Sequence, residues 1–147
     1  MIRKLHILII ILSISVLVQS LTIRKQIPLK LMTQYYLLLI YNFVAVYRSI
    51  FMTDETTKLC MFKSPLCRPI INRLLATIAE LSFAIFIGLT IENIYKIKIT
   101  KPLFLIILIA QIFCWYGVYY DHPKLNAIEG SLWVLFVLFI VWNIHTK

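Results

Sequence analysis

The chain has 147 residues, of which 61% are hydrophobic and only 14% are charged, and its formal net charge at pH 7 is +9. Soluble domains are roughly 45 to 50% apolar and about 25% charged, so this composition excludes a soluble globular protein. The positive charge does not indicate nucleic-acid binding, because Lys and Arg lie almost entirely in short segments between apolar runs, where basic residues meet lipid headgroups.

Five apolar runs fill most of the chain. A bilayer's hydrocarbon core is about 30 Å thick and an α-helix rises about 1.5 Å per residue, so roughly 17 to 25 mostly apolar residues make one span. Backbone amides in lipid must be satisfied within their own segment, and no run alternates like a barrel strand, so we predict an all-α, multi-pass transmembrane helical bundle. The short connections predict one integral membrane domain over residues 1–147. The predicted spans cover residues 5–22, 31–52, 71–95, 102–120 and 127–144.

The first run has two interpretations. Basic residues 3–4 precede an apolar stretch that ends near the small residues of segment 18–20, as in a secretory signal close to its cleavage point. Signal cores are usually about 7 to 15 residues long, however, and the apolar stretch 5–21 is longer than that. We therefore favour a retained first helix, and five spans then place the two ends of the chain on opposite sides of the membrane.

Basic residues are distributed almost evenly between the two sides that five spans would create. The connections 23–30 and 96–101 contain only basic charges, whereas Asp54, Glu55 and Asp121 fall on the opposite side. Basic connections are retained in the cytoplasm, so we expect residues 23–30 and 96–101 to face it.

The run 31–52 has one face of polar and small side chains, spaced at three- and four-residue intervals. Within it, Asn42 is suited to an interhelical hydrogen bond. Arg48 lies beside this face near the end of the run. It either pairs with Glu80 or Glu129 or extends its charge into the headgroups, which is the commoner outcome. The face consists of Tyr35, Leu38, Asn42, Ala45 and Ser49.

The connection between the second and third runs contains Cys60 and Cys67, whose spacing matches neither a zinc site nor a redox motif. If this connection faces an oxidising compartment, the two cysteines are expected to form a local disulfide. If it faces the cytosol, both are expected to be free. Cys114 lies within the fourth run, where it is interpreted as a small apolar residue.

The run 71–95 contains charged residues, and each charge inside a span costs about 2.5 to 3.5 kcal/mol on insertion scales. Glu80 lies about 13 Å from the start of this run, close to the middle of the membrane. We interpret it first as a partner that holds the bundle together, and alternatively as a buried acid for proton or cation handling or for catalysis. One helical face, expected to point into the bundle, carries Arg73, Thr77, Glu80, Ala84 and Gly88.

The run 102–120 combines small residues with aromatic ones. Ala110, Cys114 and Gly117 form a small stripe, which favours close helix packing. The aromatic residues fit a belt at the membrane interface better than a platform for stacking a ligand. They are Trp115, Tyr116, Tyr119 and Tyr120.

Polar residues gather before the fifth run. Asp121 and His122 are placed as an acid and a base at the membrane surface, although adjacent residues rarely converge on one substrate atom. Asn126 and Glu129 have the spacing of an N-terminal capping box, which is the interpretation we favour. Alternatively, Pro123 begins the helix behind a cap at Asp121 or His122, and Glu129 then lies nearly two turns inside.

The histidines do not indicate a metal site, because His6 and His145 lie near the two ends of the chain and far from His122 in sequence. We expect no metal and no other cofactor.

Four segments bear comparison with a known family: YRSIF at residues 47–51, RLLATIAE at 73–80, CWYGV at 114–118 and NAIEGSLW at 126–133. Together they resemble an uncharacterised family of small polytopic membrane proteins, over roughly residues 47–133. The resemblance implies an architecture and a set of polar positions, without a reaction. Gly130 stands where a second acid would follow Glu129, which argues against a pair of carboxylates.

Three classes of function fit these features. A structural or accessory protein would bind membrane lipids, other membrane proteins or a second copy of itself through its helix faces, and we favour this class. A transporter or channel would use Glu80, Arg73 and Arg48 along an aqueous path. A lipid-modifying enzyme would need a convergent acid, base and nucleophile at the depth of the membrane interface. The candidates are Asp121, His122, Glu129 and Arg48.

Overall fold

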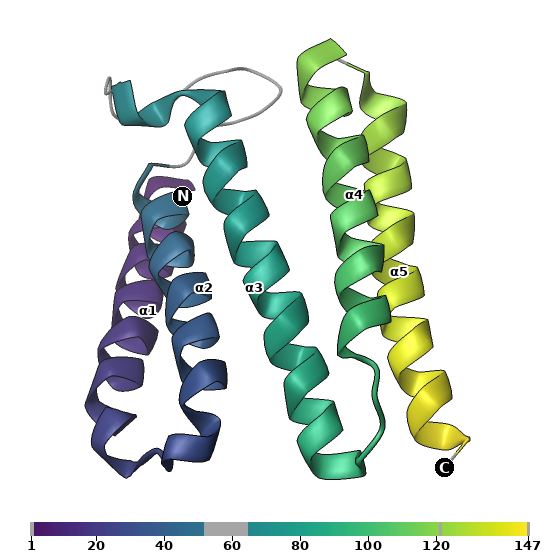
Figure 1. Ribbon diagram of the computed structural model, residues 1–147. Helices are drawn as coiled ribbons and strands as arrows, with labels where there is room; N and C mark the ends of the chain where they lie inside the picture. The colour runs from purple at the N-terminus through teal and green to yellow at the C-terminus, as the bar shows by residue number, and fades with distance from the viewer. Residues whose placement is uncertain (1, 52–64, 121, 147) are drawn as a thin grey trace. The chain divides into compact units, whose positions relative to one another are not determined.

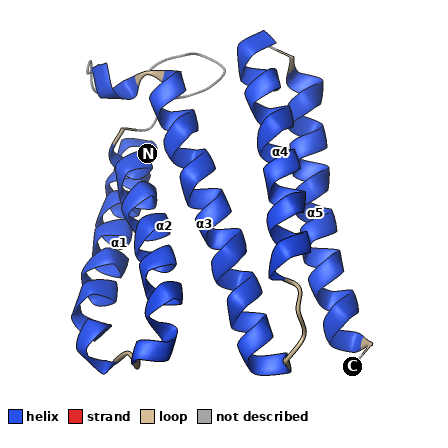
Figure 2. Ribbon diagram, viewed as in Figure 1, coloured by secondary structure: helices blue, strands red, loops and turns tan. Residues whose placement is uncertain are grey.

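A computed structural model describes residues 2–51, 65–120 and 122–146. These residues form helices joined by short connections, with no strand among them (Figure 1, Figure 2). The predicted all-α fold is therefore confirmed. The helices are α1 (Ile2–Thr22), η1 (Ile23–Gln26), η2 (Leu29–Leu31), α2 (Met32–Ile50), η3 (Pro65–Cys67), α3 (Pro69–Tyr95), α4 (Thr100–Tyr120) and α5 (Pro123–His145).

Each of the five α-helices in the described ranges is long and apolar enough to cross a membrane. Their bounds follow the apolar runs closely, because a helix in hydrocarbon continues until the chain can satisfy its amides in another way. The helical architecture and the composition together indicate a membrane protein.

Proline residues mark where three of these helices begin. Pro69 and Pro123 are the first residues of α3 and α5, and Pro102 lies in the first turn of α4. Proline suits this position because its fixed φ is already helical and the first-turn N–H groups have no intrahelical partner.

The start of α5 corrects the preferred prediction for this region. The helix begins at Pro123 behind an N-cap at His122, so Asn126 lies inside the helix and cannot form a capping box with Glu129. The alternative, in which Pro123 begins the helix, is the arrangement observed. Proline at the first position favours helix entry three residues before the Asn that otherwise fits a cap.

The chain divides into two compact units, Met1–Ser82 and Phe83–Lys147, with the boundary inside α3. In the first unit α1 and α2 pack side by side, and in the second α4 packs along α5 (Figure 1). The prediction of one integral membrane domain concerns how the two units assemble in the bilayer and stays a prediction.

In the second unit, α4 has one face whose side chains are buried. The buried positions recur every three or four residues, so they form one stripe along the helix. α5 is mostly exposed, and Phe136 is its buried aromatic contact, with the Trp133 ring 5.4 Å away. The α4 stripe consists of Leu103, Ile107, Ala110, Gln111, Cys114 and Gly117.

Candidate functional site

The polar residues singled out from the sequence are divided between the two units. The first unit holds Asn42, Arg48, Arg73 and Glu80, and the second holds His122 and Glu129. Asp121 and Cys60 lie outside the described residues.

Asn42 links the two helices of the first unit. Its Nδ2 donates a hydrogen bond of 2.8 Å to Ser20 Oγ on α1, and the pair is buried. The Ser20 hydroxyl in turn donates to the Val16 carbonyl, 2.8 Å away on its own helix. The Asn42 amide nitrogen and the Ser20 hydroxyl thus both have partners in a buried setting, where an unpaired group would cost several kcal/mol.

A second group of contacts holds the chain where α2 ends and α3 begins. The Tyr47 hydroxyl donates to the Leu66 carbonyl at 2.5 Å, and Asn72 Nδ2 donates to the Phe51 carbonyl at 3.1 Å. Cys67 is buried and disulfide-bonded, whereas the thiol of Cys114 is free and buried within α4. Because Cys60 lies outside the described residues, its pairing with Cys67 stays a prediction.

Arg48 is exposed in the last turn of α2, as the headgroup interpretation requires. Arg73 behaves differently: it lies early in α3 and only 6% of it is exposed. Glu80, two turns further along α3, is half-buried, and both Arg73 and Glu80 take part in interactions.

The face of α3 predicted to point into the bundle is only partly buried. Arg73, Ala84 and Gly88 are buried, whereas Thr77 and Glu80 are half-buried. Ala76 and Ala79, which lie outside that face, are buried as well. The Thr77 hydroxyl donates to the Arg73 carbonyl at 3.0 Å. Such a bond within one helix satisfies the hydroxyl without a second helix.

Among the buried polar atoms of the first unit without a hydrogen-bond partner within the described residues are His6 Nε2 and Tyr35 Oη. The two residues lie near the amino ends of α1 and α2 respectively. The sequence analysis assigned neither residue to a functional site. Among the described residues, neither belongs to a group of side chains that could hold a metal ion.

The connection between α3 and α4 contains the most specific polar arrangement in the second unit. The Glu92 carboxylate, in the last turn of α3, accepts a hydrogen bond of 2.9 Å from the Thr100 amide at the start of α4. Gly88 lies against the same threonine, and a Cβ at position 88 would fall 2.7 Å from the Thr100 Cα. The two helices therefore approach closely here only because residue 88 has no side chain.

The connection between α3 and α4 consists of four residues, 96–99. Lys96 has a left-handed φ of 60°, which is uncommon for a side chain other than glycine, and its Nζ donates to the Asn93 carbonyl at 2.8 Å. Ile99 is 1% exposed, while Lys96 and Lys98 are exposed. The alternation of Lys and Ile thus directs the apolar side chains inward and the charges outward.

Sequence reasoning missed Glu92, although a signal was present. An acidic side chain near the carboxyl end of a helix is disfavoured by the helix dipole, so its presence there requires another partner. Thr100 and Pro102, a few residues later, are typical of a helix start. An acid that ends one helix just before the next one begins is placed to bind the amides of the second.

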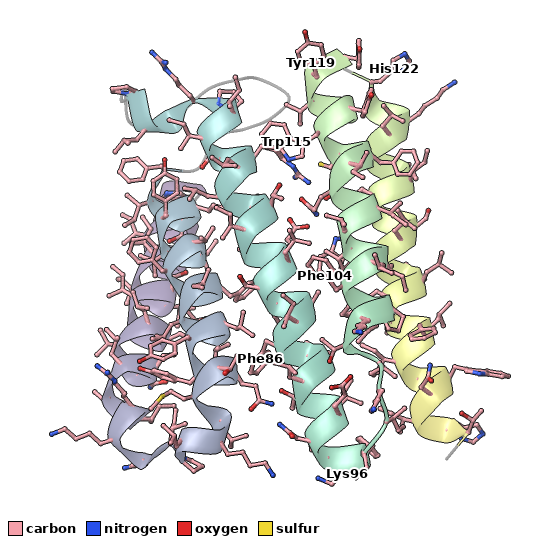
Figure 3. The ribbon with its side chains drawn as sticks, viewed as in Figure 1. Phe86, Lys96, Phe104, Trp115, Tyr119 and His122 are labelled. Carbon is pink, nitrogen blue, oxygen red and sulfur yellow. The ribbon has the colours of Figure 1, made fainter. Side chains whose placement is uncertain are left out.

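The opposite end of α4 carries an exposed aromatic cluster (Figure 3). The rings of Tyr116 and Tyr120 stack at 5.6 Å between centroids, and Tyr119 meets Tyr120 edge-on at 5.0 Å. In Figure 3, Tyr119 and His122 lie at one end of this unit and Lys96 at the other. Exposed tyrosines at one end and lysines at the other are the arrangement expected of a helix whose two ends lie at membrane interfaces.

Glu129 is half-buried in α5 and takes part in an interaction, and His122 is exposed. Within the part of the chain that the structure describes, no three His, Cys, Asp or Glu residues are grouped so that they could hold a metal ion.

Comparisons with protein-family models, with curated proteins and with solved structures gave no match for this chain.

Proposed function

We propose that the chain is a multi-pass integral membrane protein with an accessory role, which binds membrane lipids and other membrane proteins through its helix faces. The family resemblance at residues 47–133 is part of this proposal, because it too implies a small polytopic membrane protein.

The observation that carries the proposal is that polar side chains of the helices form hydrogen bonds to other elements of the fold. Asn42 binds Ser20, Asn72 binds the Phe51 carbonyl, and Glu92 binds the Thr100 amide. Each contact joins two elements of the fold. Polar side chains in a membrane bundle most often serve such helix-to-helix contacts.

The exposed surfaces support the same role. α1 and α5 expose large apolar side chains along most of their length, among them Ile11, Leu12, Leu138 and Val141. Hydroxyl groups on these helices bond to their own helix, as Ser13 does to the Ile9 carbonyl and Ser131 to the Ala127 carbonyl. Such surfaces suit contact with hydrocarbon, because they leave few unsatisfied donors.

Two features support an orientation in which connections 23–30 and 96–101 face the cytoplasm. Both connections carry only basic charges. Cys67, in the connection between α2 and α3, is disulfide-bonded, and disulfides persist on the oxidising side of a membrane. Successive connections of a multi-pass chain alternate sides, so these two indications agree.

Site-specific photo-crosslinking in native membranes tests this proposal. A photoreactive residue in place of exposed Leu138 should give adducts with phospholipid or with a few discrete membrane proteins. The matched control, at buried Ile107 on α4, should give adducts within the chain. Adducts of Leu138 with water would contradict the proposal, because they would place α5 against an aqueous phase.

A transporter or channel is the second candidate, and burial of Arg73 within a candidate span favours it. Intramembrane charges frequently mark ion pathways. Proteoliposomes that hold the purified chain should show cation or proton flux that is lost in Glu80→Gln if this candidate is right. The accessory role predicts flux equal to that of liposomes without protein.

A further inference from the structure

The α3–α4 connection carries exposed lysines, and the exposed side of α4 carries an apolar stripe that begins beside them. A phospholipid has the complementary parts, which are a phosphate headgroup and an acyl chain. We infer that this region binds an anionic phospholipid, with the headgroup at Lys98 and Lys101 and one acyl chain along α4. This inference rests on the proposed function, since it requires α3 and α4 to lie in a bilayer.

The first observation is charge. Residues 92–101 contain three lysines and one carboxylate, which leaves a net charge of +2. Lys96, Lys98 and Lys101 are all exposed. The one acid, Glu92, accepts a hydrogen bond from the Thr100 amide and also attracts Lys98, so a headgroup meets the net charge of +2 rather than three free positive charges. A phosphate-bearing headgroup therefore meets lysines that lie where the helices leave the hydrocarbon, which is the depth of lipid headgroups.

The second observation is that several contacts restrain the backbone of the segment that carries these lysines. Burial of Ile99, the close approach of Gly88 to Thr100 and the bond from Lys96 Nζ to the Asn93 carbonyl all restrain the connection. Less conformational entropy is then lost on binding, which favours affinity.

The third observation is an apolar stripe that begins at one of the lysines. Lys101 is followed on the same face of α4 by Leu105, Ile109 and Ile112, which are 54%, 46% and 51% exposed. These residues recur at intervals of four, four and three. The stripe is about 16 Å long from Lys101 to Ile112, close to the roughly 15 Å of one hydrocarbon leaflet. A cation at the head of an apolar stripe of this length complements one anionic lipid.

Native mass spectrometry of the detergent-purified chain can measure this preference, with phosphatidylglycerol and phosphatidylcholine of identical acyl chains supplied in equal amounts. The unaltered chain should retain phosphatidylglycerol preferentially. The double variant Lys98→Gln with Lys101→Gln should lose about 30-fold of that preference, because each basic residue near an anionic surface favours it by about fivefold. Lys98→Arg with Lys101→Arg should keep the preference, since the charge remains.

The matched control changes net charge equally at another place. Arg68, just before α3, and Lys124, in the first turn of α5, are both exposed, and the proposed five-span topology places them on the opposite side of the membrane. Arg68→Gln with Lys124→Gln should therefore alter the preference less than about twofold. An equal loss in the two double variants would overturn the inference, because it would show a dependence on net charge alone. No loss in either, or binding of inorganic phosphate at these lysines as tight as that of the lipid, would overturn it too.

Carbonate extraction of the same membranes separates this inference from the proposed function. If alkaline carbonate releases the chain, the proposed membrane integration fails. If the chain stays in the membrane but shows no preference for phosphatidylglycerol, only the lipid inference fails.

Discussion

The α1–α2 and α3–α4 pairs are both joined by short basic connections, yet they are fixed at different places. No residue of η1 or η2 is buried, and the polar link between α1 and α2 lies inside the span, at Asn42 and Ser20. In the α3–α4 pair the link lies at the connection itself, between Glu92 and Thr100. The polar contact that joins the two helices thus lies within the span in the first pair and next to the connection in the second.

The largest effect is expected at Gly88. Replacing Gly88 by Ala places a Cβ 2.7 Å from the Thr100 Cα, so the helices must separate, at a cost of about 1 to 3 kcal/mol. Gly130 is the matched control, because a Cβ there meets nothing within 4 Å, and Gly130→Ala should stabilise α5 by about 0.5 to 1 kcal/mol. Thermal unfolding in detergent, followed by tryptophan fluorescence, measures both. Equal shifts in the two variants would show that the close approach does not restrain the pair.

A smaller effect is expected at Glu92. Glu92→Leu removes the acceptor for the Thr100 amide and should destabilise the chain by about 0.5 to 2 kcal/mol, as loss of a helix cap does. Glu92→Gln keeps an acceptor oxygen and loses only the attraction between the carboxylate charge and the amino end of α4, about 0.3 to 1 kcal/mol. The same unfolding assay should therefore rank Gln between the unaltered chain and Leu. A Gln variant as unstable as Leu would contradict the capping role.

The smallest effect is expected within the first pair. A double-mutant cycle of Asn42→Leu and Ser20→Ala should give a coupling energy of about 0.6 kcal/mol, and no more than about 1.7, as measured for other interhelical hydrogen bonds in membranes. Ser13→Ala serves as the control, because the Ser13 hydroxyl bonds only to its own helix. A coupling energy indistinguishable from zero would show that the hydrogen bond between Asn42 and Ser20 does not stabilise the α1–α2 pair.

Most of the fold could be predicted from the sequence, because membrane helices are specified by local composition. The five apolar runs follow from length, and the burial of Arg73, Ala84 and Gly88 follows from their spacing along α3. Both are properties of the chain taken one segment at a time. The long apolar runs also leave little choice of secondary structure.

The contacts that depend on where the chain turns could not be predicted in the same way. Asn126 has the spacing of a cap, but Pro123 begins α5 earlier, and two local signals of similar strength compete there. The sequence places Glu92 in the apolar run 71–95 and does not indicate its bond to Thr100, because Thr100 comes within reach only after the chain reverses direction. Asn42 was recognised as a bonding residue, whereas its partner Ser20 lies in a different span.

The membrane topology of the chain is tested most directly by labelling single added cysteines with a membrane-impermeant maleimide. Cys67 is disulfide-bonded and Cys114 is buried, and the unaltered chain measured alongside gives the background. Five membrane crossings predict that Lys25→Cys and Lys98→Cys label from one side of sealed membranes and that Lys124→Cys labels from the other. Labelling of positions 25 and 98 from opposite sides, or of positions 98 and 124 from the same side, would contradict the five-span arrangement.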